Sequence, residues 1–314
     1  MATFKLRNWK PKYLKGENPE TARLIGVEFE GEPKSVSEIE NEYDKIITDI
    51  KLEESISWDY AKRAYVATED GKKYKDKFDF MKKYLAKNLG VEVGGIGVDG
   101  GGREFATLPD SYGNYVKGGS ERFKKVVAFL ERTTNADKDS GTHINISKLD
   151  SDTRTTWNNI YWYMMCFGPQ LQKIFGRRSH WAKIPLPKEY FCSNSGSNMM
   201  FEVPTKRPKP EWVYSKGSMV VDKGNRYEFR GPKASHDLDE VLAWIQFCNN
   251  IVEICANGYI KDMPFAEALK GKYIRAYLTK IAENPEREIT SKERAMTISK
   301  IGYVKVINEQ NKIF

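Results

Sequence analysis

Strict alternation of polar and apolar residues in several short segments is the feature that most constrains this chain. In Gly26–Glu30, Glu28 and Glu30 alternate with Val27 and Phe29. Because successive side chains of a β-strand point to opposite faces, this segment predicts a strand with one polar and one apolar face. A sheet built from such strands needs cover on its apolar face only. The pattern therefore favours an α+β fold, an antiparallel sheet with helices on one side.

The same alternation occurs in Asn225–Arg230, where Arg226, Glu228 and Arg230 would share one face of a strand. A carboxylate between two guanidinium groups suits a site that holds a divalent cation and a phosphate together. Taken alone, this segment is better interpreted as a solvated strand face with salt bridges. The functional interpretation gains weight because further segments carry the same kind of polar face.

One of these segments contains a histidine. In Gly141–Ser147, Ile144 and Ile146 would face the core, which places His143 and Asn145 on the polar face. The chain has only three histidines. A lone histidine in a strand is more often structural than a ligand, but this one accompanies strands whose polar faces carry metal- and phosphate-binding groups.

A fourth segment, Asp99–Pro109, begins with glycines and continues into an extended stretch that carries Glu104. Gly95, Gly97 and Gly100 match the GxGxxG pattern of dinucleotide-binding folds. We reject that interpretation because an extended stretch and a proline follow, so no helix N-terminus would face the phosphate. The sequence also lacks the GxxxxGK[ST] pattern of P-loop NTPases.

The four segments occur in the order Gly-x-Glu-x-Glu, Asp-Gly-small-x-x-Glu-Phe, Gly-x-His-Ile-x-Ile and Arg-x-Glu-Phe-Arg. This order resembles the amidoligases, carboxylate–amine ligases often found in phage and bacterial gene clusters. The resemblance covers roughly residues 24–256. It implies a glutamine synthetase-like catalytic domain, with a curved, mainly antiparallel sheet and helices packed on one face.

The resemblance also implies a role for each matching residue. The expected metal ligands are Glu28, Glu30, Glu104, His143 and Glu228. The expected catalytic residues, which act on the phosphoryl group or the substrate carboxylate, are Arg226, Arg230 and Arg178. The expected nucleotide contacts are Glu30, His143, Arg177 and Arg230.

The activity implied by the resemblance is ATP-dependent formation of an amide or peptide bond. Phosphoryl transfer from ATP would convert a carboxylate into an acyl phosphate, which an amine can attack. The expected cofactors are ATP and Mg²⁺ or Mn²⁺, whose cations would bridge the phosphates. The expected partners are a carboxylate and an amine, each a peptide or a small molecule.

Two alternatives remain open at the level of sequence. Asn145 stands where the family usually has a second histidine, and Gly101 stands where a serine is common. These departures motivate a non-catalytic binding or structural protein, of phage type, that keeps the ligase fold. The net charge of +8 and the pI of about 9.0 motivate a third interpretation, a metal-dependent nucleic-acid binder, although no compact basic stripe with interleaved aromatics occurs.

The expected organisation has three parts. Residues 1–22 form a basic arm, residues 23–258 form the ligase-like domain, and residues 259–314 form a basic C-terminal extension packed on it. Within the domain, residues 36–90 are an insertion and residues 176–217 are a loop or lid. A loop of this length in a compact domain is often functional.

Local patterns predict the main helices. Ser37 and Glu40 form a capping-box pattern that predicts a helix to about Ile50. Apolar spacing predicts a helix ending at Gly90, and a third helix opens at Ser120. The remaining expected helices are 152–175, kinked near Gly168-Pro169, and 238–257.

The chain carries no expected membrane or export segment. Its longest apolar run, Ile160–Phe167, is too short to span a bilayer, and its first residues lack the apolar stretch of a signal peptide. The four cysteines form no CxxC pair, which favours reduced thiols. We therefore expect a cytoplasmic protein, in the host cytoplasm if the gene belongs to a phage.

Overall fold

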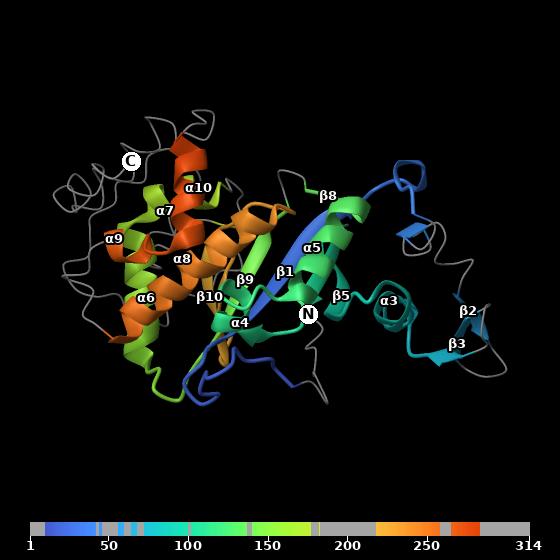
Figure 1. The fold of residues 1–314 in the computed structure, drawn as a ribbon, viewed down its shortest axis with the longest axis horizontal. Helices are drawn as coiled ribbons and strands as arrows, with labels where there is room; N and C mark the ends of the chain where they lie inside the picture. The colour runs from blue at the N-terminus through green and yellow to red at the C-terminus, as the bar shows by residue number, and fades with distance from the viewer. Residues whose placement is uncertain are drawn as a thin grey trace, which may run out of the picture.

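The computed structural model describes residues 10–41, 44–45, 56–59, 64–67, 72–99, 102–136, 140–176, 182, 218–257 and 265–282. These residues form one large antiparallel sheet with helices against it, and a small separate sheet (Figure 1). This architecture confirms the predicted α+β class.

The large sheet has the strand order β10-β11-β9-β1-β6-β5, and each neighbouring pair is antiparallel. Its strands are β1 (Leu24–Pro33), β5 (Val93–Asp99), β6 (Gly102–Thr107), β9 (Thr142–Ser147), β10 (Val220–Asp222) and β11 (Arg226–Phe229). Two short strands, β7 (Asp110–Ser111) and β8 (Thr134–Asn135), also pair with β1. The three segments with the clearest alternation therefore become the adjacent strands β11, β9 and β1.

A second sheet lies within the predicted insertion of residues 36–90. Its strands are β2 (Ile56–Asp59), β3 (Ala64–Ala67) and β4 (Lys73–Tyr74), in that order. It is followed by α3 (Lys77–Tyr84), which contacts β5 of the large sheet.

The remaining helical elements follow the sheet strands along the chain. They are a 3-10 turn (Val36–Glu38), α4 (Tyr112–Val116), α5 (Glu121–Thr133), α6 (Arg154–Cys166), α7 (Gly168–Phe175), α8 (Leu238–Asn257), α9 (Phe265–Ala268) and α10 (Lys272–Ala282). In Figure 1, α4, α5 and α8 lie in front of β1 and β9.

Aromatic pairs join these helices to the apolar face of the sheet. Phe29 of β1 stacks on Phe123 of α5, with ring centroids 6.2 Å apart. Tyr227 of β11 stacks on Trp157 of α6 at 6.1 Å. Each aromatic side chain buried in this way contributes roughly 1.5–3 kcal/mol by removing apolar surface from water. Packing on the odd-numbered face of β1 therefore leaves the even-numbered face to the polar residues.

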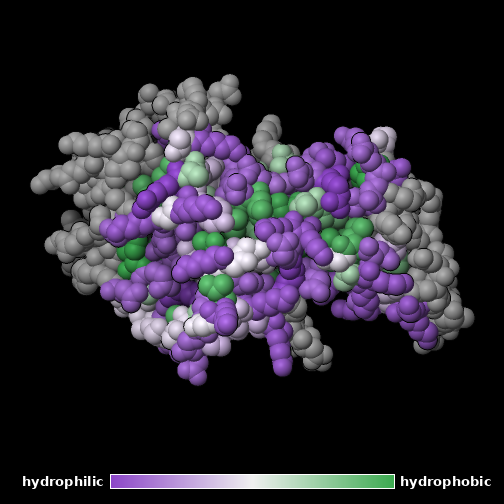
Figure 2. Space-filling view, viewed as in Figure 1, coloured by the Kyte–Doolittle hydropathy of each residue, from purple (hydrophilic) through white to green (hydrophobic). Residues whose placement is uncertain are grey.

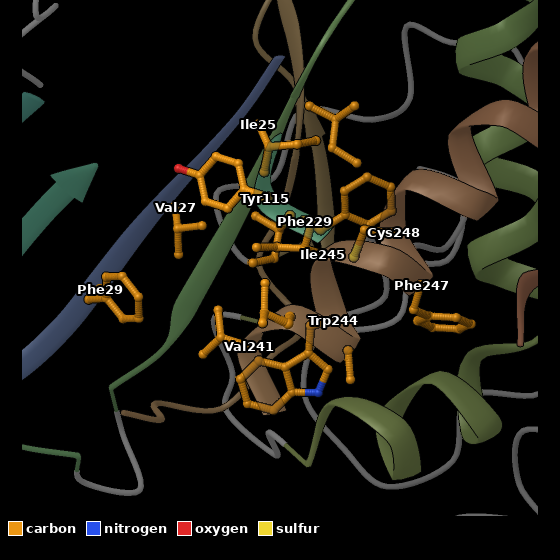
Figure 3. Close-up of a cluster of buried hydrophobic side chains, with 14 of the residues drawn as sticks. Ile25, Val27, Phe29, Tyr115, Phe229, Val241, Trp244, Ile245, Phe247 and Cys248 are labelled. Carbon is orange, nitrogen blue, oxygen red and sulfur yellow. The ribbon is translucent and has the colours of Figure 1, made fainter. Parts of the chain in front are cut away.

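Helix α8 lies at the centre of the core. Val241, Trp244 and Ile245 are buried in the same hydrophobic cluster as Ile25 of β1 (Figure 3). The Trp244 indole donates a hydrogen bond to the Ile174 carbonyl at 3.2 Å, which satisfies its one polar atom. The helix predicted for residues 238–257 is confirmed.

Several predicted helix boundaries are confirmed by their capping contacts. The Ser120 hydroxyl accepts a hydrogen bond from the Phe123 amide, as an N-cap does. Gly90 ends the helix of residues 77–89 in the left-handed conformation, at φ 62°, although residues 85–89 are π-helical. The kinked helix of residues 152–175 is two helices, broken at Phe167.

The helix predicted from Ser37 is wrong at its start. The Ser35 hydroxyl and amide both contact the Glu38 carboxylate, at 2.5 and 2.8 Å, so the local cap forms two residues earlier. The turn that follows is a 3-10 turn of three residues, and residues 39–41 are not helical. Residues 44 and 45 are helical, as predicted, and residues 42–43 and 46–50 lie outside the described part.

The rejection of a dinucleotide fold is supported by the hairpin of β5 and β6. Gly95 and Gly97 lie inside β5, and the chain continues into β6 rather than into a helix. No helix start is therefore available to a phosphate at this point.

Few large hydrophobic side chains of the described residues are exposed to solvent. Hydrophilic side chains cover most of the described surface in the view of Figure 2, with hydrophobic residues gathered in its middle. Among the described residues, Val98 is the one large hydrophobic side chain that is well exposed, at 63%. None of the described helices combines the length and the hydropathy that crossing a bilayer requires.

Candidate metal and phosphate site

Strand register brings the predicted site residues together on the polar face of the sheet. Glu28 of β1 lies opposite His143 of β9, and Glu30 lies opposite Glu104 of β6. Residues directly opposite each other in antiparallel strands point to the same face. The alternation of each strand selects the face, and the register decides which side chains meet on it.

Three of the five predicted metal ligands form one group. A ligand atom from each of Glu28, His143 and Glu228 lies within 4.8 Å of the other two. His143 is the centre of the arrangement, because its Nδ1 is 3.3 Å from Glu28 Oε2 and its Nε2 is 3.2 Å from Glu30 Oε1. The imidazole is nearly fully buried, at 2% exposed, so these contacts hold it in a fixed orientation.

The other two predicted ligands lie beside this group. Glu30 contacts the outer nitrogen of His143, on the side away from Glu28. Glu104 is the cross-strand neighbour of Glu30 and is partly exposed. They extend the acidic side of the face from β1 toward β6.

Cationic side chains gather on the opposite side, around Glu228. Lys223 Nζ is 3.0 Å from one carboxylate oxygen of Glu228, and Arg230 Nε is 3.3 Å from the other. Arg226 Nη2 is 3.8 Å from Glu28 Oε1, and this arginine is 37% exposed. The polar face thus changes from cationic at β11 to anionic at β1 and β6.

Lys223 was not among the residues singled out from the sequence. It lies in the tight turn between β10 and β11, where its amide donates to the Arg226 carbonyl at 2.9 Å. The turn sequence Asp222-Lys223-Gly224-Asn225 between two alternating stretches is a hairpin signal. That signal could have placed Lys223 beside Glu228.

Asn145 connects the acidic and the cationic sides. Its amide nitrogen donates to Glu28 Oε1 at 3.1 Å, and its amide oxygen accepts from Arg226 Nε at 2.7 Å. Asn145 also lies directly opposite Glu228 in the β9–β11 pairing. A residue outside the predicted ligand set therefore lies at the centre of the site.

The charge environment shifts the pKa of Glu28. Burial by itself would raise it, but the hydrogen bond and the charge of His143, with the charges of Arg226 and Lys223, outweigh burial and lower the pKa. Glu28 is therefore ionised at neutral pH, as a metal ligand must be.

These donors fit a divalent cation. Ionised carboxylate oxygens suit Mg²⁺ and Mn²⁺, and one imidazole in the set makes Mn²⁺ the better match. Ligand atoms around such an ion lie about 4 Å apart at most, which small side-chain rotations from the present spacing provide. Arg177 and Arg178, the remaining predicted phosphate-binding residues, lie outside the described residues.

Comparison of the sequence with protein-family models and with curated proteins found no match. The functional argument for this chain accordingly rests on its motifs and on the geometry of this site.

Proposed function

We propose that this protein is an ATP-dependent carboxylate–amine ligase of the amidoligase type that uses Mg²⁺ or Mn²⁺. One observation carries the proposal: Glu28, His143 and Glu228 form a group of metal-ligand type, and Lys223, Arg226 and Arg230 lie directly beside it. Phosphoryl transfer needs this combination, because a divalent cation and cationic side chains together neutralise the phosphate charge.

The architecture supports the same proposal. An antiparallel sheet whose helices pack on the apolar face gathers its charged side chains on the other face. A glutamine synthetase-like fold has this general arrangement, and we include that fold in the proposal. The order of the motif strands in the sheet, β11-β9-β1-β6, places all four motifs side by side.

Each part of the site has a task in such a reaction. When bound, the cation would polarise the phosphoryl oxygens and lower the barrier to transfer. Arg226 is exposed enough to contact a phosphate, and its guanidinium would bind the transferred group by paired hydrogen bonds. Arg230 and Lys223 balance the charge of Glu228 in the free protein, so both can turn to an anion once a cation binds that carboxylate.

Calorimetric titration of ATP with excess Mn²⁺ tests the proposal, in wild-type protein and in Glu228→Gln. We expect Mn²⁺-dependent ATP binding by the wild-type protein. The substitution should weaken it at least roughly 10-fold, since even residues that only support metal ligands contribute that much.

Glu121→Gln is the matched control. Glu121 is an exposed carboxylate on α5, the helix that packs against the apolar face of the sheet. Removing its charge should leave ATP affinity unchanged. If folded wild-type protein binds neither Mn²⁺ nor Mn²⁺–ATP, the ligase proposal is wrong and the non-catalytic interpretation takes its place. If Glu228→Gln binds both as the wild-type protein does, this face is not the site.

A further inference from the structure

Asn145 occupies the gap between a carboxylate and an arginine that do not contact each other closely. Glu28 Oε1 and Arg226 Nη2 are 3.8 Å apart, beyond hydrogen-bond distance. The Asn145 amide bonds to both residues at 3.1 and 2.7 Å. It is buried, at 6% exposed, so water does not replace it easily.

The chemistry of the three groups fixes the orientation of the amide. A guanidinium can only donate hydrogen bonds, and an ionised carboxylate can only accept them. A group between them must accept on one side and donate on the other, and an amide does both without a charge. The amide oxygen therefore faces Arg226, and the amide nitrogen faces Glu28.

A neutral bridge has a consequence that a direct ion pair would not have. If Arg226 closed onto Glu28, the arginine would compensate the carboxylate charge, and neither group would be available to a ligand. With Asn145 between them, one oxygen of Glu28 stays oriented toward His143, and the Arg226 side chain remains 37% exposed.

We infer that Asn145 is a positioning residue that holds Glu28 for a divalent cation and Arg226 for a phosphate at the same time. The inference deepens the proposed function and rests on it. It also reinterprets the departure from the family pattern, because a neutral imidazole and an amide each carry one donor atom and one acceptor atom.

A double-mutant cycle tests this role, with binding as the measurement. The proteins are wild type, Asn145→Ala, Arg226→Ala and the double variant, each titrated with Mn²⁺ alone and with ATP at saturating Mn²⁺. Asn145→Ala should weaken Mn²⁺ binding roughly 10-fold, the usual effect of losing a partner of a metal ligand. Arg226→Ala should leave Mn²⁺ affinity unchanged or raise it, because a cation near Glu28 is removed.

The ATP titrations test the contact between Asn145 and Arg226. Asn145→Ala and Arg226→Ala should each weaken ATP binding on the order of 10-fold, as expected for hydrogen bonds to charged groups. The double variant should bind ATP about as Arg226→Ala does, because Asn145 acts through the arginine. Additive losses in the double variant would overturn the assignment.

Two further variants separate positioning from folding and from contact alone. Asn145→Leu fills the same volume without either hydrogen bond and should behave as Asn145→Ala does. Asn225→Ala removes another amide that contacts Arg226, at 3.4 Å and on the exposed side, without any contact to Glu28. This control should bind Mn²⁺ and ATP as the wild-type protein does.

The outcomes distinguish this inference from the proposed function. If wild-type protein binds Mn²⁺ but not ATP, the ligase proposal fails, and the Mn²⁺ titrations still decide whether Asn145 supports Glu28. Unchanged Mn²⁺ affinity in both Asn145→Ala and Asn145→Leu overturns the inference while the ligase proposal stands. Absence of any Mn²⁺ binding by wild-type protein overturns both.

Discussion

His236 should make the stability of this protein depend on pH between neutrality and pH 5. It lies in the segment between β11 and α8, with its Nε2 3.1 Å from the Thr134 hydroxyl. That hydroxyl donates its single hydrogen to the Leu130 carbonyl at 2.8 Å, so it accepts from the histidine. Nε2 of His236 therefore carries a hydrogen.

Burial, followed by the positive charge of Lys34, lowers the pKa of His236 from 6.5 to about 4. Between these two values the unfolded chain binds a proton that the folded protein excludes. Stability due to this residue is thus complete above pH 6.5 and is lost as the pH falls toward 4. At about 1.4 kcal/mol per pKa unit, lowering the pH from about 7.5 to 5 should cost about 2 kcal/mol.

Urea unfolding at pH 5, 6 and 7.5 measures this effect, in wild type and in His236→Gln. Glutamine keeps a donor for Thr134 but does not titrate, and other titrating groups cancel in the difference between the two proteins. The advantage of the wild type over the variant should fall by about 2 kcal/mol from pH 7.5 to pH 5. Lys34→Met, which removes the nearby charge, should reduce the fall. Parallel stability curves for wild type and His236→Gln would refute the reasoning.

Two further predictions concern other parts of the fold. Gly271→Ala should destabilise the protein by about 2 kcal/mol, because φ is +130° and a Cβ would lie 2.1 Å from Gln246, whose amide oxygen caps α10. Gly16, with φ +88°, has open space around it, so Gly16→Ala should cost less stability in the same urea titration. Equal losses of stability in the two variants would contradict the steric argument. Glu28→Gln should lower the free energy of unfolding above about pH 4.5, where the wild-type carboxylate is ionised in both the folded and the unfolded protein. The stability difference between wild type and variant should shrink as the pH falls through the lowered pKa of Glu28 in the folded protein. A stability difference that grows as the pH falls would contradict the charge environment described for Glu28.

Local chemistry determined much of the candidate site in advance. The period of two in Gly26–Glu30 and in Asn225–Arg230 depends only on neighbouring residues, so the sequence alone assigned their side chains to faces. The same holds for the Ser120 cap and for the glycines that exclude a dinucleotide site, because each involves contacts a few residues apart. The helix start predicted at Ser37 was wrong for a related reason. Two Ser-x-x-Glu patterns overlap there, and the structure forms the contacts of Ser35 with Glu38.

The sequence named the candidate metal ligands, but it did not define how they group in space. Whether Glu28 meets His143 or another residue depends on the pairing of strands more than 100 positions apart. A shift of one residue in that register would move every partner to the other face. For this reason the grouping of Glu28, His143 and Glu228, with Glu30 and Glu104 beside them, appears only in the folded chain.

The sequence by itself determined the polar and apolar faces of the strands, the α+β class and the candidate ligands, since these follow from residue type and short-range periodicity. The tertiary structure alone decided the contact that joins the two sides of the site. It placed Asn145 between Glu28 and Arg226. An amide offers one donor and one acceptor in any sequence context, and only the pairing of β1, β9 and β11 gives those atoms their two partners.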